Sequence, residues 1–168
     1  FKGFGEEGVG FLTPGDTVLM ISPVYAPYTQ FVEDRQLKLV NISIDSETGE
    51  LDEESFLKAK AHKDRIKAII LIDPNNPTGF PVQPEVLEKI ADVAEAHNSL
   101  ILTDEVYAQF FKGNMSIVQI ERARKRTIRI NALSKIERAT GVRFGDIYLA
   151  PEASTYIAES IIEPECPG

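Results

Sequence analysis

The sequence predicts an α/β fold, a three-layer αβα sandwich with a mainly parallel sheet. The run at residues 68–72 is apolar, rich in β-branched residues and without polar alternation, as expected for a strand buried on both faces. It ends abruptly in a polar, proline-broken loop, and two later apolar runs also end in polar residues. Stretches with helical periodicity separate the runs, which indicates βαβ units with helices on both faces of the sheet.

The first half of the chain supplies strands and helices in alternation. Residues 1–10 carry four glycines and are expected to be irregular. Asp52 can cap a helix, with two glutamates in the first turn, where the helix dipole favours anions. The strands expected here are 17–21, 37–44 and 68–72, and the helices are 28–35 and 52–61.

The second half continues the alternation. Pro84 suits the first turn of a helix, and apolar residues at helical spacing follow it as far as His97. The basic cluster at 122–126 precedes a strand rather than following one, so we interpret it as a solvated connection and not as an anion site. The expected helices are 84–97, 116–122 and 152–162. Three strands are expected: one that begins at Leu100, one over 127–131 and one over 146–149.

Composition excludes several classes of protein. A net charge of −8 argues against nucleic-acid binding, which needs a basic surface, and no apolar run approaches membrane-spanning length. The single cysteine, Cys166, excludes an internal disulfide and fits a reducing compartment, so we expect a cytoplasmic location. With no cysteine cluster and no paired histidines, a metal site is not expected, and His62 and His97 are interpreted as surface or packing residues.

Polar side chains follow three of the expected strands. Asn76 follows the first, Asp104 and Tyr107 follow the second, and Lys135 and Arg143 follow the third. In an open α/β sheet, ligands bind just beyond the carboxyl ends of the strands. Any one of these boundaries could be an ordinary loop, but the three in this order and spacing indicate a ligand site.

The motifs around these residues resemble a known family. Asn-Pro-Thr-Gly at 76–79, Asp-Glu-Val-Tyr at 104–107, and Ser-Lys at 134–135 followed by Gly-x-Arg-x-Gly at 141–145 are similar to the large domain of fold type I pyridoxal phosphate enzymes. The closest pattern is that of the class I/II aminotransferases, and the resemblance covers about residues 11–151. It implies a pyridoxal 5'-phosphate cofactor, amino acid and 2-keto acid substrates, and a homodimer.

The resemblance also assigns roles to residues. Lys135 would form the Schiff base with the cofactor and act as the catalytic base, and Asp104 would hold the protonated pyridine nitrogen. Asn76 and Tyr107 would donate to the phenolate oxygen of the cofactor. Tyr25 would stack on the cofactor ring, and Ser134 matches the serine that precedes the lysine in the family. Arg143 would bind the phosphate, because its planar guanidinium can hold two oxygens.

Four of these assignments have a purely structural alternative, which for Lys135 is an ordinary surface charge. Asp104 could cap a turn, Tyr107 could be a core aromatic residue, and Tyr25 could pack a helix on the sheet. Two positions depart from the family pattern. Ala132 stands where a serine or threonine often binds phosphate, and Asp146 stands where an aromatic residue is common.

The resemblance leaves the reaction and the extent of the protein open. A pyridoxal phosphate-dependent β-lyase or aspartate β-decarboxylase of the same fold is an alternative to the aminotransferase, and so is a non-catalytic binding domain. We expect residues 1–168 to be a single domain that forms most of the cofactor-binding large domain, with the native start and the small substrate domain outside it. On that interpretation this chain alone should not transaminate.

Overall fold

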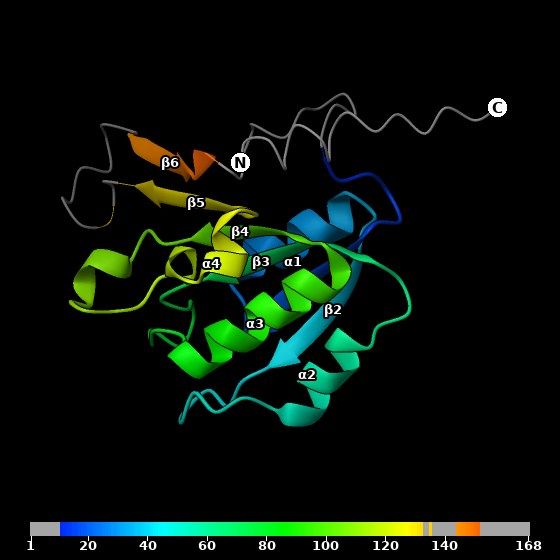
Figure 1. Ribbon diagram of the computed structural model, residues 1–168, viewed down its shortest axis with the longest axis horizontal. Coiled ribbons are helices and arrows are strands. Elements are labelled where there is room, and N and C mark those ends of the chain that lie inside the picture. Colours follow the sequence, from blue (N-terminus) through cyan, green and yellow to red (C-terminus); the bar gives the residue numbers. More distant parts are fainter. Residues whose placement is uncertain (1–10, 133–134, 136–143, 152–168) are drawn as a thin grey trace.

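The computed structural model describes residues 11–132, 135 and 144–151, and its architecture is the predicted one. One six-stranded sheet has the order β2-β1-β3-β4-β5-β6 (Figure 1). The first five strands are parallel to their neighbours and β6 is antiparallel to β5. The strands are β1 (Thr17–Ser22), β2 (Lys38–Ser43), β3 (Ile66–Ile72), β4 (Leu100–Asp104), β5 (Thr127–Ala132) and β6 (Gly145–Leu149).

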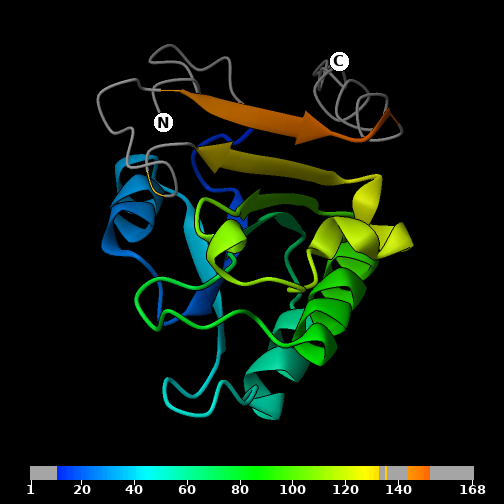
Figure 2. The ribbon, with the colours of Figure 1, turned by 90° about the vertical axis from the view of Figure 1, so that its left-hand side faces the viewer.

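Helices cover both faces of this sheet, which gives the three layers. Figure 2 shows α1 on one side of the strands and α2 and α3 on the other. The α-helices are α1 (Ala26–Asp34), α2 (Glu53–Lys60), α3 (Pro84–His97) and α4 (Glu121–Arg124), and two short 3₁₀ helices are η1 (Ala108–Phe110) and η2 (Ile117–Gln119).

The central strand β3 contributes to two cores because its side chains alternate between the two faces. Ile69 and Leu71 belong to the larger core, together with Leu87 and Ile90 of α3. Ala68, Ile70 and Ile72 belong to the smaller core, which includes Tyr28 and Val32 of α1. All of these β3 side chains are buried, which explains the unbroken apolar run in the sequence.

The helix ends follow the capping signals of the sequence. Asp52 accepts hydrogen bonds from the backbone N–H groups of Glu54 and Ser55 at the start of α2, as predicted. Helix α3 begins at Pro84, as predicted, and ends at Asn98, which adopts the left-handed conformation with φ of 51°. Helix α1 begins two residues before its predicted start, with a proline in its first turn.

Two predictions in the region before β5 are wrong. The single helix expected over 116–122 is split, because Ile120 is extended (φ −82°, ψ 113°) and separates η2 from α4. The basic cluster is not merely a solvated connection either. Arg126 is buried and donates to the carbonyl of Ala94 and to Oδ1 of Asn98, and Arg122 forms ion pairs with two acids of α3.

His97 packs against the end of α2 as predicted, with Nε2 at 3.1 Å from the carbonyls of Ala59 and Lys60.

The remaining expectations concern absences or residues outside the described part of the chain. Within the described residues, no helix has the length and apolar character needed to cross a membrane. The same part of the chain contains no group of three metal-ligating side chains. The expectations for 1–10, the helix at 152–162 and Cys166 lie outside the described residues.

Candidate active site at the carboxyl end of the sheet

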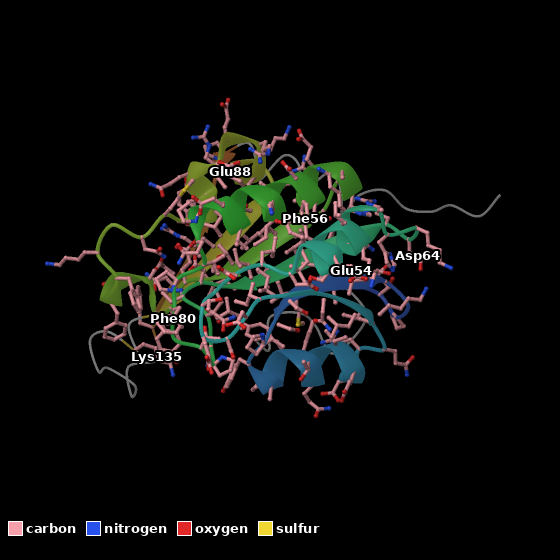
Figure 3. The ribbon with its side chains drawn as sticks, turned by 90° about the horizontal axis from the view of Figure 1, so that it is seen from below. Glu54, Phe56, Asp64, Phe80, Glu88 and Lys135 are labelled. Atoms are coloured by element: carbon pink, nitrogen blue, oxygen red, sulfur yellow. The ribbon has the colours of Figure 1, made fainter. Side chains whose placement is uncertain are left out.

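The described residues predicted to form the site come from four separate places at the carboxyl end of the parallel strands. Tyr25 follows β1, Asn76 follows β3, and Tyr107 follows β4, which itself ends at Asp104. Lys135 follows β5, and Figure 3 shows it at the same end of the molecule as Phe80 of the Asn76 loop, with Asp64 at the opposite end. The parallel pairing thus brings residues distant in the chain to one edge of the sheet.

The loop after β3 is held by its own polar side chains. The side chain of Asn75 donates to the carbonyl of Pro23 at 3.1 Å and accepts from the hydroxyl of Thr78 at 3.0 Å. The backbone closes around it, since the N–H of Gly79 donates to the carbonyl of Asn75 at 2.8 Å, with φ of 78° at Gly79. Glycine is favoured there because other residues rarely adopt that conformation. Asn75 therefore ties the loop that presents Asn76 to the segment that presents Tyr25.

Asp104 has a donor on each carboxylate oxygen. The hydroxyl of Tyr28 donates to Oδ2 at 2.6 Å, and the backbone N–H of Val106 donates to Oδ1 at 3.2 Å. The bond from Val106 is a turn cap, which is the structural alternative to a cofactor role for Asp104. The bond from Tyr28 fixes the orientation of the carboxylate and leaves accepting capacity on both oxygens, since a carboxylate has about four lone-pair sites.

Tyr28 is a site residue that sequence reasoning missed. Its side chain is buried, and burial, followed by the charge of Asp104, raises the pKa of Tyr28, so the phenol remains a donor at neutral pH. The ring of Tyr25 meets that of Tyr28 edge to face at 6.3 Å between centroids. The Tyr-x-x-Tyr spacing was a usable signal, because residues three apart at a helix start lie on the same side.

Asn76 and Tyr107 line a common pocket. Its volume is about 290 Å³, and its wall comes from the Asn76 loop on one side and from Tyr107 and the start of the next segment on the other. The lining residues are Pro74, Asn75, Asn76, Pro77, Gly79, Tyr107, Phe110 and Phe111. The Nζ atom of Lys135 lies 5.5 Å from the centroid of the Tyr107 ring, so the predicted catalytic amine is next to this pocket.

Tyr25 is partly exposed, at 47%, and does not have the enclosed position of a packing residue. Its exposure weakens the alternative that it only packs α1 on the sheet, since Tyr28 and Val32 do that instead. Ser134 and Arg143 lie outside the described residues, so their assignments remain predictions.

The Gly-x-Arg-x-Gly motif has a structural requirement at its last position. A Cβ atom at Gly145 would lie 2.7 Å from the carbonyl oxygen of Asn131, closer than side-chain carbons approach backbone oxygens. Only glycine lets β6 pair with β5 at that point. At the same end, the side chain of Asn131 accepts from the N–H of Ala132 at 2.8 Å.

The described residues fit the chemistry of pyridoxal phosphate. A held carboxylate suits a pyridinium nitrogen, an amide and a phenol that line one pocket suit a phenolate oxygen, and an amine beside them suits an aldehyde. This donor set, at the carboxyl ends of parallel strands, defines the class of protein as a pyridoxal phosphate-type α/β fold.

Comparison with known proteins identifies the family. Residues 6–164 match the family model for aminotransferase class I and II, so the chain belongs to that family. It is 33% identical over 135 residues to an aspartate aminotransferase of Pyrococcus horikoshii, which covers 80% of this chain and 34% of that protein. It is 37% identical over 149 residues to aromatic-amino-acid aminotransferase 2 of Thermococcus litoralis, with 84% and 37% covered.

Solved structures agree with this assignment. The alanine aminotransferase of Pyrococcus furiosus superposes with a TM-score of 0.74 at 31% identity, over 89% of this chain and 39% of that one. Cystalysin of Treponema denticola, whose structure contains pyridoxal 5'-phosphate, gives a TM-score of 0.75 at 25% identity, over 89% and 40%. The chain therefore spans somewhat more than a third of the length of its relatives.

Proposed function

We propose that this chain forms the cofactor-binding part of a pyridoxal phosphate-dependent aminotransferase that acts on amino acids and 2-keto acids. The observation that carries the proposal is the convergence of Asn76, Asp104, Tyr107 and Lys135 at one edge of the sheet, with Asn76 and Tyr107 lining the same pocket. When bound, pyridoxal phosphate supplies an electron sink for the bond changes at the substrate Cα.

The chain's own residues would bind and orient that group. Asp104, held by Tyr28, would keep a proton on the ring nitrogen, and Asn76 and Tyr107 would donate to the ring oxygen. Tyr25 would cover a face of the ring. The amine of Lys135 would attach the cofactor and then carry the proton that leaves the substrate Cα.

We further propose that residues 1–168 are a single domain, most of the large domain, and that the family's small substrate domain is not part of it. The share of the relatives that the chain covers supports this interpretation. A homodimer in the cytoplasm is also proposed, from the family resemblance and the single cysteine. On this proposal the groups that grip the substrate and exclude water belong to the small domain, so the 168 residues alone should not transaminate.

Covalent trapping at Lys135 tests the proposed function. The full-length protein with pyridoxal phosphate should absorb in the visible region, and borohydride reduction should fix the cofactor to the peptide that contains Lys135. Lys135→Ala should abolish both the fixation and transamination, because it removes the amine that lies beside Tyr107.

Lys112→Ala is the matched control, because Lys112 is an exposed lysine at the same end of the sheet. It should leave trapping and turnover unchanged. Fixation at Lys112 or Lys125 instead would contradict the assignment of Lys135. Assaying the full-length protein with aspartate separates the reactions, since a keto acid product indicates transamination and alanine with carbon dioxide indicates β-decarboxylation.

A further inference from the structure

Two buried acids at the carboxyl end of the sheet have no part in the chemistry described above. Asp73 follows β3 and is 1% exposed, and Glu105 follows β4 and is 5% exposed. Strand alternation puts them on the face of the sheet that α3 covers, with Leu71 and Thr103, whereas Asp104 points to the other face, toward Tyr28. The two acids therefore lie behind the site rather than in it.

Asp73 closes the loop that carries Asn76. Its Oδ1 atom accepts from the backbone N–H of Val82 at 2.9 Å, so the two ends of the 73–82 loop are joined through a buried bond. The same oxygen accepts from the side chain of Asn114 at 3.5 Å, which reaches across from the segment after β4. One carboxylate thus holds the Asn76 loop shut and connects it to the neighbouring segment.

Glu105 closes the segment that carries Tyr107. Its Oε1 atom accepts from the hydroxyl of Ser116 at 2.5 Å and from the hydroxyl of Thr103 at 3.4 Å. The 105–116 segment leaves the sheet at Glu105 and returns to the same side chain at Ser116. Asn114, the residue that contacts Asp73, lies in that returning stretch, so the two closures share one segment.

Burying two carboxyl groups lowers the stability of the folded protein, so this pair is unfavourable if its role is only structural. Burial, with a further contribution from the charge of Glu105, raises the pKa of Asp73 to about 6. Burial also raises the pKa of Glu105, against the attraction of Arg129. Asp104 and Arg129 are the other charged groups that act on the pair. Buried acids of this kind are costly to stability, and such groups cluster at functional sites.

We propose that Asp73 and Glu105 are positioning residues, which hold the Asn76 loop and the Tyr107 segment against each other so that both side chains face one pocket. The consequence for the cofactor rests on the proposed function, in which Asn76 and Tyr107 donate to the same oxygen. Fixing two donors in advance improves binding because the loops need not be ordered when the ligand arrives.

Hydrogen–deuterium exchange without cofactor tests whether Asp73 and Glu105 hold the two loops in place, which we call the bracing. In the full-length protein, Asp73→Ala should raise exchange in peptides within 73–82, and Glu105→Ala should raise it within 105–116, each by more than about tenfold. Asp73→Asn and Glu105→Gln keep an acceptor oxygen and should stay within about threefold of the wild type. Ser99→Ala removes a buried hydroxyl bond at the opposite end of β4 and should change neither peptide.

Pyridoxal phosphate titration tests the consequence for the site. Asp73→Ala should weaken binding by more than about tenfold in the wild-type background, but by less than about threefold when Asn76 is already alanine, because the loss is transmitted through Asn76. If either alanine variant fails to fold, Asn114→Ala and Ser116→Ala remove the partner atoms and should raise exchange in the same peptides.

The outcomes separate this inference from the proposed function. Unchanged exchange in both loops would overturn the bracing, and full additivity of Asp73→Ala with Asn76→Ala would overturn the route through Asn76. Wild-type protein that fails to bind pyridoxal phosphate, while its loops still respond to the variants, would support the bracing and contradict the proposed function.

Discussion

The two ends of the sheet both bury polar side chains, but the partners of those side chains differ. At the amino end, the buried Arg126 donates to the carbonyl of Ala94, in the last turn of α3, and to the side chain of its cap, Asn98, while the exposed Arg65 donates to the carbonyls of His97 and Asn98. Ser99 likewise donates to a backbone carbonyl, that of Ile66. At the carboxyl end the buried polar side chains include two acids, Asp73 and Glu105, which accept hydrogen bonds from Val82 and Ser116 in the loops.

The difference shows which buried polar groups serve the fold alone. The amino-end cations complete a helix C-terminus, where the dipole favours positive charge and where four carbonyls lack partners within the helix. The carboxyl-end acids instead fix loops that present Asn76 and Tyr107 to a pocket. Changes at the first end should therefore affect stability, and changes at the second should affect the site.

The sharpest test of this comparison is Asp104→Asn. The variant keeps the shape but removes the charge that would hold the pyridinium proton, so activity of the full-length protein should fall by more than about 100-fold. The free energy of unfolding without cofactor should change by about 1 kcal/mol or less, because the amide oxygen can still accept from the N–H of Val106 and the hydroxyl of Tyr28 can accept from the new amide N–H. A large loss of stability with activity retained would make Asp104 a structural residue like those at the amino end.

Arg126→Met makes the opposite prediction. It leaves acceptors of Ala94 and Asn98 without their buried donor, so the free energy of unfolding should fall by about 3 kcal/mol in chemical denaturation. Affinity for pyridoxal phosphate should remain within about twofold. Lys125→Met, at the exposed neighbour, is the control and should change neither quantity. A loss of affinity in Arg126→Met at full stability would erase the distinction between the two ends.

Asp73 predicts a pH dependence that belongs to the carboxyl end. Its pKa is raised from 3.8 to about 6 in the folded protein, so the folded state binds more protons than the unfolded state between these values. The stability that protonated Asp73 contributes is thus present below about pH 4 and is lost as the pH rises through about 6, by at most roughly 3 kcal/mol.

Denaturation curves across pH 4–7 measure this contribution as the difference between wild type and Asp73→Asn. In Asp73→Asn the free energy of unfolding should fall less steeply as the pH rises. In Asp34→Asn, which changes an exposed acid of α1, it should fall as in the wild type. Identical slopes in wild type and Asp73→Asn would show that the raised pKa of Asp73 has no bearing on stability.

Tyr28→Phe gives the smallest expected effect. It removes one donor from the carboxylate of Asp104 and leaves the ring packed in the smaller core, so cofactor affinity should fall by about tenfold and stability by about 1 kcal/mol. Tyr148→Phe, on the exposed edge strand β6, is the matched control. Unchanged affinity in Tyr28→Phe would mean that the loop alone, through Val106, orients Asp104.

Much of the fold could be predicted from local signals. Strand β3 follows from an unbroken apolar run, α2 from its cap at Asp52, and α3 from Pro84 and its periodic apolar residues. The split at Ile120 could not be predicted, because the burial of Ile117 and Ile120 against α3 overrides the helical tendency of the segment. Local propensity loses to packing at such positions.

The site was predictable where residues follow strands and not where they meet across the chain. Asn76, Asp104, Tyr107 and Lys135 could be named because each stands in a motif at a strand end. The Tyr-x-x-Tyr spacing could have indicated Tyr28, but its bond to Asp104 joins residues 76 positions apart, and no local pattern predicts that partner. The burial of Asp73 and Glu105 was missed for the same reason, since acids after a strand are ordinarily solvated.

The parallel order of the sheet also sets when the site can exist during synthesis. Strand β1 lies between β2 and β3, so its second neighbour is made only after the α2 crossover, and the pocket wall at Tyr107 needs β4 as well. Of the described site residues Lys135 emerges last, more than a hundred residues after Tyr25. Such long-range pairing closes slowly. A ribosome-bound chain can therefore hold a nearly finished sheet while it still lacks the amine, so capture of the cofactor must come after the sheet has formed.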